Sequence, residues 1–251
     1  MSASNVGTEI EGRIATITFS TPQHNALPSK ELQALETSFR AVSKREDIYL
    51  IIFKSGGDRT FCAGASFEEL MKISNEQEGK AFFLGFARVI QAMRDCRQPI
   101  LARVQGKAVG GGVGLAAAAD YCLATRFSSI KLSEISIGIG PFVIGPAVQR
   151  KMGIAAFSQL TLAAHQFFEA EWALHHGLFQ AVYDDQQELD KAVQDLAERL
   201  ITYNPEALRL TKQMFYEGEP DWKPIMDARA ALSGSLVLSS FTRERLQAFK
   251  S

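Results

Sequence analysis

Three consecutive glycines, Gly110 to Gly112, constrain the fold of this chain more than any other feature. They open a short alanine-rich segment, residues 111–119, that is typical of a helix. Without Cβ atoms, the backbone here can adopt unusual angles and approach a ligand closely. A helix start also presents unpaired N–H groups, which favour an oxygen that carries negative charge. The segment therefore predicts a binding site for such an oxygen.

A second glycine-containing turn precedes this segment in the chain. It follows an apolar run and has the sequence Phe61-Cys-Ala-Gly-Ala-Ser66. Two such turns can each direct one amide at the same oxygen, which is the requirement for an oxyanion hole. The pair of turns therefore indicates an enzyme.

Composition and charge exclude several classes of function. The chain has 251 residues, of which 46% are hydrophobic and 22% are charged, as in ordinary globular proteins. A net charge of −1, from 27 basic and 28 acidic residues, gives no electrostatic basis for binding nucleic acid or a membrane surface. The three cysteines lack metal-ligand spacing and suit a reducing compartment. We expect a cytoplasmic protein without a signal peptide, a membrane span or a metal site.

The order of predicted elements indicates an α/β fold. Strand-like apolar runs at residues 14–19, 49–53, 100–104 and 121–125 alternate with helical patterns. The helical patterns begin at Pro28 and cover residues 78–96 and 111–119. Such alternation predicts a layered arrangement with a mainly parallel sheet.

From about Gly145 the pattern becomes helical throughout. We expect an α/β core over residues 1–190 and a C-terminal helical region over residues 191–251 that serves oligomerisation. The apolar residues of that region predict packing on the core or on a neighbouring subunit; they include Phe215, Trp222, Ile225, Met226, Leu236, Val237 and Leu238.

The glycines also fit a second interpretation, a dinucleotide fingerprint. Gly112-Val-Gly114 resembles the start of G-x-G-x-x-G, and Glu134 lies 20 residues beyond Gly114, the spacing of an acidic ribose ligand. Position 117 is alanine, however, and the helix ends by Asp120, which is too short for a crossover. A third interpretation, glycines that only allow close helix packing, stays open.

Motifs along nearly the whole chain resemble those of one family. They are Asn25-Ala-Leu27, Phe61-Cys-Ala-Gly-Ala65, Gln105-Gly106, Gly110-Gly-Gly112, Asp120, Ser133-Glu134, Ile137-Gly138, His176-Gly-Leu178, and Asn204-Pro-Glu-Ala207 with Lys212. In order and spacing these motifs closely resemble the crotonase superfamily of enoyl-CoA hydratases and isomerases. The resemblance implies a spiral of ββα units with a C-terminal helical region, and a homotrimer or homohexamer. It also implies acyl-CoA thioesters as substrates and no metal or redox cofactor.

By this resemblance, the backbone N–H groups of Ala65 and Gly111 match the family's oxyanion hole, and Glu134 matches a catalytic carboxylate. Donors of this kind stabilise the enolate that forms when a proton leaves a thioester, because they are fixed before the reaction. Glu134 is therefore predicted to transfer the proton. The residues expected to contact the substrate are Ala63, Ser66, Phe67, Gly110 and Phe142.

One departure from the family pattern bears on the reaction. Typical hydratases carry a first carboxylate two residues after the triple glycine, and this chain has Gly114 there. With Glu134 alone, moving a proton between two carbons of one enolate is simpler than hydration, which commonly uses two acids. Isomerisation of a 3-enoyl-CoA to a 2-enoyl-CoA is therefore favoured.

Other reactions remain open at this point. Branched-chain hydratases of the methylglutaconyl-CoA type share the glycine and have a similar loop at residues 141–145, so hydration of a 2-enoyl-CoA is an alternative. A non-catalytic acyl-CoA-binding subunit is another. Dehalogenation is disfavoured, since Phe142 stands where that reaction needs an aspartate nucleophile. The sequence does not give the acyl chain length, its branching or the pathway.

Overall fold

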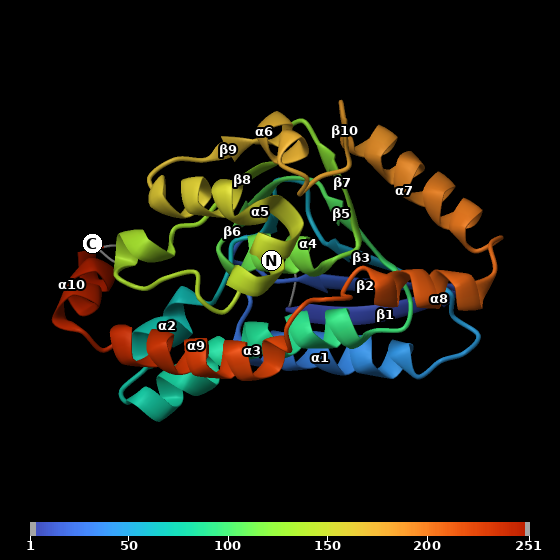
Figure 1. Cartoon of the computed structure of the whole chain (residues 1–251). Helices are drawn as coiled ribbons and strands as arrows, with labels where there is room; N and C mark the ends of the chain where they lie inside the picture. The colour runs from blue at the N-terminus through green and yellow to red at the C-terminus, as the bar shows by residue number, and fades with distance from the viewer. Residues whose placement is uncertain (1–3, 249–251) are drawn as a thin grey trace.

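The computed structural model of the protein describes residues 4–248 and consists of two sheets with helices around them (Figure 1). The larger sheet has the strand order β1-β2-β3-β5-β7-β10, and the smaller has the order β4-β6-β8-β9. β1 pairs antiparallel with β2, and β9 pairs antiparallel with β8. All other neighbouring strands are parallel, so the predicted parallel character is confirmed.

The elements have the following bounds. The larger sheet contains β1 (Asn5–Glu11), β2 (Ile14–Ser20), β3 (Leu50–Ser55), β5 (Ile100–Val104), β7 (Tyr121–Thr125) and β10 (Ala181–Tyr183). The smaller contains β4 (Thr60–Cys62), β6 (Lys107–Val109), β8 (Ser129–Lys131) and β9 (Phe168–Glu169). The helices are α1 (Ser29–Ser43), α2 (Phe67–Lys72), α3 (Glu76–Asp95), α4 (Gly111–Ala118), the 3₁₀ turn η1 (Glu134–Ile137), α5 (Gly145–Leu162), α6 (Ala170–His175), α7 (Gln186–Leu200), α8 (Pro205–Met214), α9 (Trp222–Leu236) and α10 (Ser240–Ala248).

Three successive ββα units build the core. In each unit the first strand joins the larger sheet and the second joins the smaller sheet: β3 with β4, β5 with β6, and β7 with β8. The helices that follow are α2 and α3 in the first unit, α4 in the second, and η1 and α5 in the third. This repetition gives the spiral of ββα units that the family resemblance implies.

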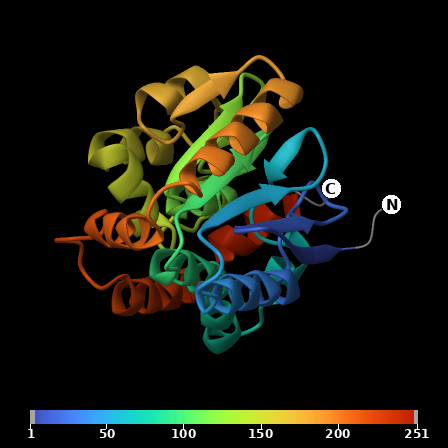
Figure 2. The ribbon, with the colours of Figure 1, turned by 90° about the vertical axis from the view of Figure 1, so that its right-hand side faces the viewer.

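The central strands of the larger sheet, β3, β5 and β7, are largely buried because each face meets a helical layer. On one face, Leu50 and Ile52 of β3 pack with Leu189 and Val193 of α7. Figure 2 shows α7, coloured orange, lying across this sheet. Residues of the opposite face, such as Phe53, belong to the main core, to which α1, α3 and α4 also contribute.

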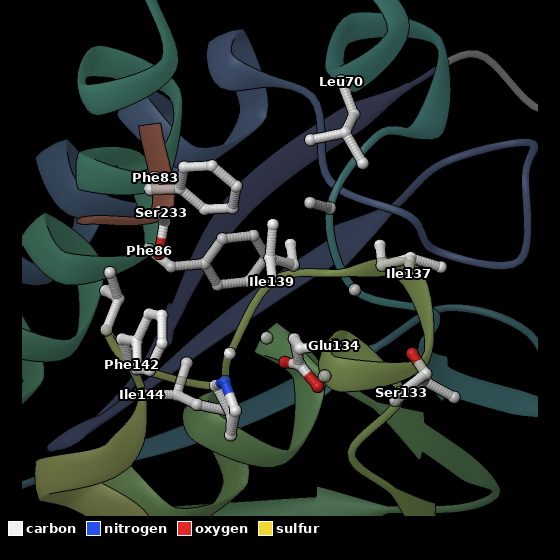
Figure 3. Close-up of a pocket in the computed structure, with 18 of the residues that line it drawn as sticks. Leu70, Phe83, Phe86, Ser133, Glu134, Ile137, Ile139, Phe142, Ile144 and Ser233 are labelled. Atoms are coloured by element: carbon white, nitrogen blue, oxygen red, sulfur yellow. The ribbon is translucent and has the colours of Figure 1, made fainter. Parts of the chain in front are cut away.

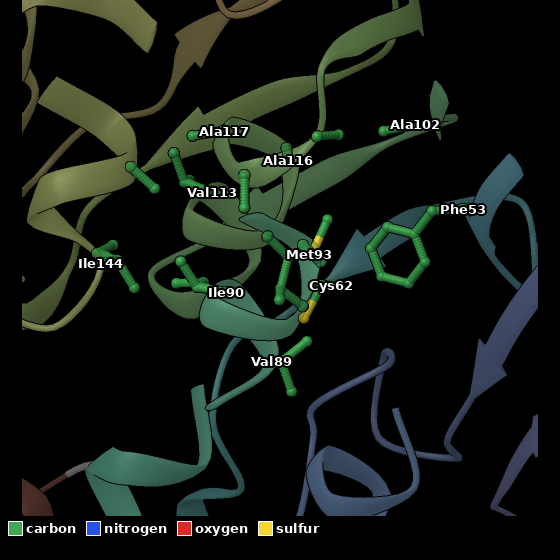
Figure 4. Close-up of a cluster of buried hydrophobic side chains, with 14 of the residues drawn as sticks. Phe53, Cys62, Val89, Ile90, Met93, Ala102, Val113, Ala116, Ala117 and Ile144 are labelled. Atoms are coloured by element: carbon green, nitrogen blue, oxygen red, sulfur yellow. The ribbon is translucent and has the colours of Figure 1, made fainter. Parts of the chain in front are cut away.

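The main core is packed tightly where α4 meets α3. Figure 4 shows Ile90 and Met93 of α3 on the side of that helix that faces Val113 and the alanines of α4. All of these side chains are buried. The small side chains of α4 let this helix lie inside the molecule, with its first turn directed toward the cavity described below.

The C-terminal third is not entirely helical, which corrects the expectation from sequence. β9 and β10 lie within it, each at the edge of a sheet. Both are too short, at 2 and 3 residues, for a strand pattern to stand out in sequence. The remainder is helical as expected, and the predicted helical pattern from Gly145 onward begins with α5, which has a kink at Gly153. Residue 190, the expected end of the core, lies within α7.

A buried ion pair fixes the C-terminal helices to the core. Lys212 of α8 lies 2.9 Å from Asp120, and their side chains are 2% and 4% exposed. The Lys212 ammonium also donates hydrogen bonds to the carbonyl oxygens of Met93 and Gln98, at 3.0 Å each. Asn204 caps α8 by accepting from the N–H groups at its start. The motif at residues 204–212 is therefore explained by structure.

Helix α9 packs against α3 at a contact between two glycines. A Cβ placed at Gly79 of α3 would lie 2.6 Å from Cα of Gly234 of α9, so the two backbones touch. Three of the apolar residues expected to pack on the core or on a neighbouring subunit, Trp222, Met226 and Val237, are buried within this subunit. Helix α9 is therefore held on its own subunit by apolar contacts and by the contact between the two glycines.

Candidate active site

The turn at residues 63–66 is held in place by the loop that contains Asn25. Asn25 has φ +58, and its buried side-chain amide donates to the carbonyl oxygens of Gly56 and Thr60 at 2.8 Å each. Asparagine tolerates this left-handed conformation better than most residues. The next part of the loop pairs with the turn, where the Leu27 N–H donates to the Gly64 carbonyl at 2.8 Å. This motif thus supports the turn and does not itself reach the cavity.

The two glycine-containing turns lie side by side, as the sequence predicts. Gly64 has φ +90, and a Cβ there would lie 2.9 Å from the Val109 carbonyl oxygen and 3.7 Å from the Gly111 nitrogen. Within residues 4–248, neither the Ala65 N–H nor the Gly111 N–H donates a hydrogen bond. Gly111 is also the first residue of α4, where the helix dipole favours negative charge. The two amides therefore meet the chemical requirement for an oxyanion hole.

Each glycine of the triplet meets a different neighbour. Gly110 has φ +53, and a Cβ on it would lie 2.9 Å from Oε1 of Glu134. A Cβ on Gly111 would overlap the ring of Phe86, and one on Gly112 would lie 2.5 Å from the Cys62 carbonyl oxygen. Close packing and a functional role therefore coincide in these three residues.

Glu134 starts η1 and brings a carboxylate to the beginning of α4. Its Oε2 atom is buried and has no hydrogen-bond partner within the described part of the chain. Burial raises the pKa of Glu134 from 4.5 to about 7. A general acid or base is most effective when its pKa lies near the working pH. This carboxyl group can therefore both accept and return a proton near neutrality.

These groups meet in a cavity of about 310 Å³, within the size range of small-molecule sites (Figure 3). Seven of the eight predicted site residues line it: Ala63, Ala65, Phe67, Gly110, Gly111, Glu134 and Phe142. Ser66 does not line it; its side chain accepts a hydrogen bond from the Glu69 N–H and caps α2. A substrate contact by Ser66 stays a prediction without support from this geometry.

The position of the missing family acid, residue 114, is closed by packing. A Cβ on Gly114 would lie 2.5 Å from Cγ2 and 2.7 Å from Cβ of Ile144. Glu134 is the one acidic side chain among the described residues that line the cavity. The space of a first carboxylate is thus taken by an apolar side chain from the loop after Pro141.

Several lining residues could not be assigned to the site from sequence. Phe82, Phe83 and Phe86 of α3 have the spacing of core residues, and the structure places them both in the core and at the cavity wall. Ile139 and Ser233 carry no recognisable motif. Their place in the site depends on how distant segments pack, which a local pattern does not show.

Comparison with known proteins identifies the family. The model of the enoyl-CoA hydratase/isomerase family matches residues 9–250. The chain belongs to this family, and so to the crotonase superfamily. It is 30% identical over 220 residues to the short-chain-enoyl-CoA hydratase of Clostridium acetobutylicum, covering 87% of this chain and 83% of that one. These matches confirm that the protein is an enzyme of the family.

Two further matches extend the comparison within the enoyl-CoA hydratase/isomerase family. The peroxisomal Delta(3,5)-Delta(2,4)-dienoyl-CoA isomerase of Arabidopsis thaliana is 27% identical over 244 residues, covering 90% of this chain and 86% of that one. The crystal structure of an enoyl-CoA hydratase from Bacillus halodurans superposes with a TM-score of 0.90 at 22% identity, covering 97% and 99% of the two chains. The latter confirms the predicted fold.

Residues 4–248 contain no group of three or more His, Cys, Asp or Glu side chains arranged to hold a metal ion. None of the helices in that part of the chain is long and apolar enough to cross a bilayer.

Proposed function

We propose that the protein isomerises a 3-enoyl-CoA to a 2-enoyl-CoA, with Glu134 as the single proton carrier. The observation that carries this proposal is the pairing of one buried carboxyl group with two free amides in a cavity whose second acid position is closed. No resident metal or redox cofactor is needed for this reaction, since CoA is part of the substrate.

The reaction can be followed atom by atom. The thioester carbonyl oxygen would accept hydrogen bonds from the N–H groups of Ala65 and Gly111. Glu134, as carboxylate, would take a proton from C2, and the electrons of that C–H bond would form a dienolate over the thioester and the C3–C4 double bond. The now neutral Glu134 would return the proton to C4, which leaves the double bond between C2 and C3. Donors fixed in advance can lower the barrier of such a step by about 3–4 kcal/mol each.

Hydration of a 2-enoyl-CoA is the second candidate. Its support is the name of the short-chain-enoyl-CoA hydratase of Clostridium acetobutylicum and the presence of Ser133 and Ser136 beside Glu134 in the cavity. A hydroxyl could hold the water that a second carboxylate holds in other hydratases. Branched substrates of the methylglutaconyl type belong to this candidate. A role in binding alone is less well supported, because a buried carboxylate without a partner destabilises a protein that does not use it.

The two candidates are separated by a panel of substrates. Purified protein is given 3-hexenoyl-CoA, 2-hexenoyl-CoA and methylglutaconyl-CoA, and double-bond migration and water addition are measured separately. We expect migration to be faster than addition. Ready hydration without migration would contradict the single-acid mechanism. Binding of all three thioesters with neither migration nor addition would leave only a binding role.

A further inference from the structure

One polar group in the cavity has no function in the proposed reaction. Ser233 of α9 lines the cavity and is 1% exposed. Its Oγ atom has no hydrogen-bond partner within residues 4–248. Serine in a helix commonly bonds the carbonyl four residues earlier, and this one does not. A buried hydroxyl without a partner costs stability, so its retention at this place calls for a ligand that pairs with it.

The backbone around Ser233 is fixed. The next residue, Gly234, is in contact with α3, where a Cβ on it would lie 2.5 Å from the Lys80 nitrogen. This contact sets the rotation and register of α9 on α3. Figure 3 shows the result, with Ser233 beside Phe83 and Phe86 and away from Glu134. The hydroxyl is therefore held at the aromatic wall of the cavity, apart from the reacting groups.

The chemistry of this wall selects for uncharged ligands. Only two charged residues, Glu134 and Lys131, are among the described residues that line the cavity. The Lys131 ammonium donates to the His165 carbonyl at 3.3 Å and lies 5.3 Å from the centre of the Phe167 ring. A carboxylate at the end of an acyl chain would thus meet aromatic rings and one hydroxyl. Burial of an unpaired charge is far more costly than burial of a neutral oxygen.

We propose that Ser233 is a specificity residue that hydrogen-bonds an uncharged oxygen on the distal part of the acyl chain. The substrate class is then an acyl-CoA with a keto, hydroxyl or ether oxygen beyond the reacting carbons. This inference rests on the proposed function, in which the cavity holds the acyl chain. Glu134, Ala65 and Gly111 do not recognise this oxygen.

Binding of unreactive saturated thioesters tests this directly. Hexanoyl-CoA is compared with 4-oxohexanoyl-CoA, 5-oxohexanoyl-CoA, 6-hydroxyhexanoyl-CoA and adipoyl-CoA by calorimetry. At least one uncharged oxygenated chain is expected to bind about three- to tenfold more tightly than hexanoyl-CoA, the effect of one neutral hydrogen bond. Ser233→Ala should bring this ratio to about one. Ser235→Ala, on the exposed side of the same helix, is the matched control and should keep it.

The outcomes separate this inference from the proposed function. The role of Ser233 is overturned if hexanoyl-CoA binds but no oxygenated thioester binds more tightly. It is also overturned if the tighter binding persists in Ser233→Ala. In both cases the acyl-CoA function stands. Tightest binding of adipoyl-CoA would overturn the choice of an uncharged tail. A protein that binds none of the five thioesters would contradict the proposed function as well.

Discussion

Replacing Glu134 by glutamine is expected to slow the enzyme and to stabilise it at the same time. The amide keeps the shape of the side chain but cannot take up a proton, so kcat should fall by roughly 10²–10⁴-fold while acyl-CoA binding is retained. The gain in stability has a separate origin. The folded protein holds this carboxyl group away from water, and the glutamine has no charge to bury.

The size and pH range of this gain follow from the pKa. A rise from 4.5 to about 7 corresponds to a destabilisation of about 3 kcal/mol when the group is charged. Between these two pH values the folded state binds a proton that the unfolded state has released, so the free energy of unfolding of the wild type decreases as pH rises. The free energy of unfolding of Glu134→Gln should therefore exceed that of the wild type by an amount that increases with pH. We expect this excess to be about 3 kcal/mol larger at pH 8 than at pH 4.5.

Urea unfolding from pH 4.5 to pH 8 measures this difference. The protein concentration must be constant, because subunit association would add to the apparent stability. Glu11→Gln is the control, since that side chain is exposed and forms no ion pair within residues 4–248, and it should not reproduce the change of about 3 kcal/mol. If the difference in free energy of unfolding between Glu134→Gln and wild type does not change with pH, the inference of a buried carboxyl group with a raised pKa is refuted. A variant that keeps more than about half of its kcat would refute its role as proton carrier.

Three other substitutions and one measurement on the wild type have defined outcomes. Gly111→Pro removes an amide donor and should lower kcat by about 10²–10³-fold. Gly114→Ala pushes a methyl group against Ile144 and should reduce the free energy of unfolding by about 1–3 kcal/mol in urea titrations. Lys212→Ala leaves Asp120 buried and unpaired, and should reduce it by about 3–5 kcal/mol. In light scattering, the wild type is expected to behave as a trimer or hexamer.

Each of these predictions has a control or a contrary result. Gly111→Ala presses on the same Phe86 ring but keeps the N–H, so equal rates for the alanine and proline variants would exclude this amide as a donor. Gly7→Ala, with no neighbour closer than 3.9 Å to the new methyl, should leave stability unchanged. Lys223→Ala, at an exposed site, should do likewise. A stable monomer at micromolar concentration would contradict the predicted oligomer.

Four strands of the larger sheet, β2, β3, β5 and β7, were predictable because each is a run of apolar or β-branched residues. β1 and β10 were not predicted, because β1 is mostly exposed and β10 has only three residues. The strands at Ile100–Val104 and Tyr121–Thr125 have the expected bounds, since all of their residues except Tyr121 are buried. β4, β6 and β8 have three residues each, too few for any periodicity to show in sequence. Their pairing depends on the long-range closure of the spiral. The smaller sheet therefore became visible only in three dimensions.

The meeting of Glu134, Ala65 and Gly111 in one cavity was predictable from local motifs, but two other features of the site were not. In sequence, a glycine at position 114 is equally consistent with a lost acid and with a packing requirement. The structure supports a packing requirement, because a Cβ at this position would overlap Ile144. Ser233 lies in a segment without a motif, and its place follows from the contact of Gly79 with Gly234, 155 positions apart in the chain. Sequence patterns report local structure, whereas both of these features are set by distant packing.

The position of α9 on its own subunit has a consequence for synthesis of the protein. Ser233 follows Glu134 by 99 positions, and a ribosome adding about 5–20 residues per second needs roughly 5–20 s for this stretch. Until then Phe83 and Phe86 of α3 lack the cover that α9 provides. The nascent chain thus carries an apolar surface that a chaperone can bind, and the wall for the acyl chain is the last part of the site to be made.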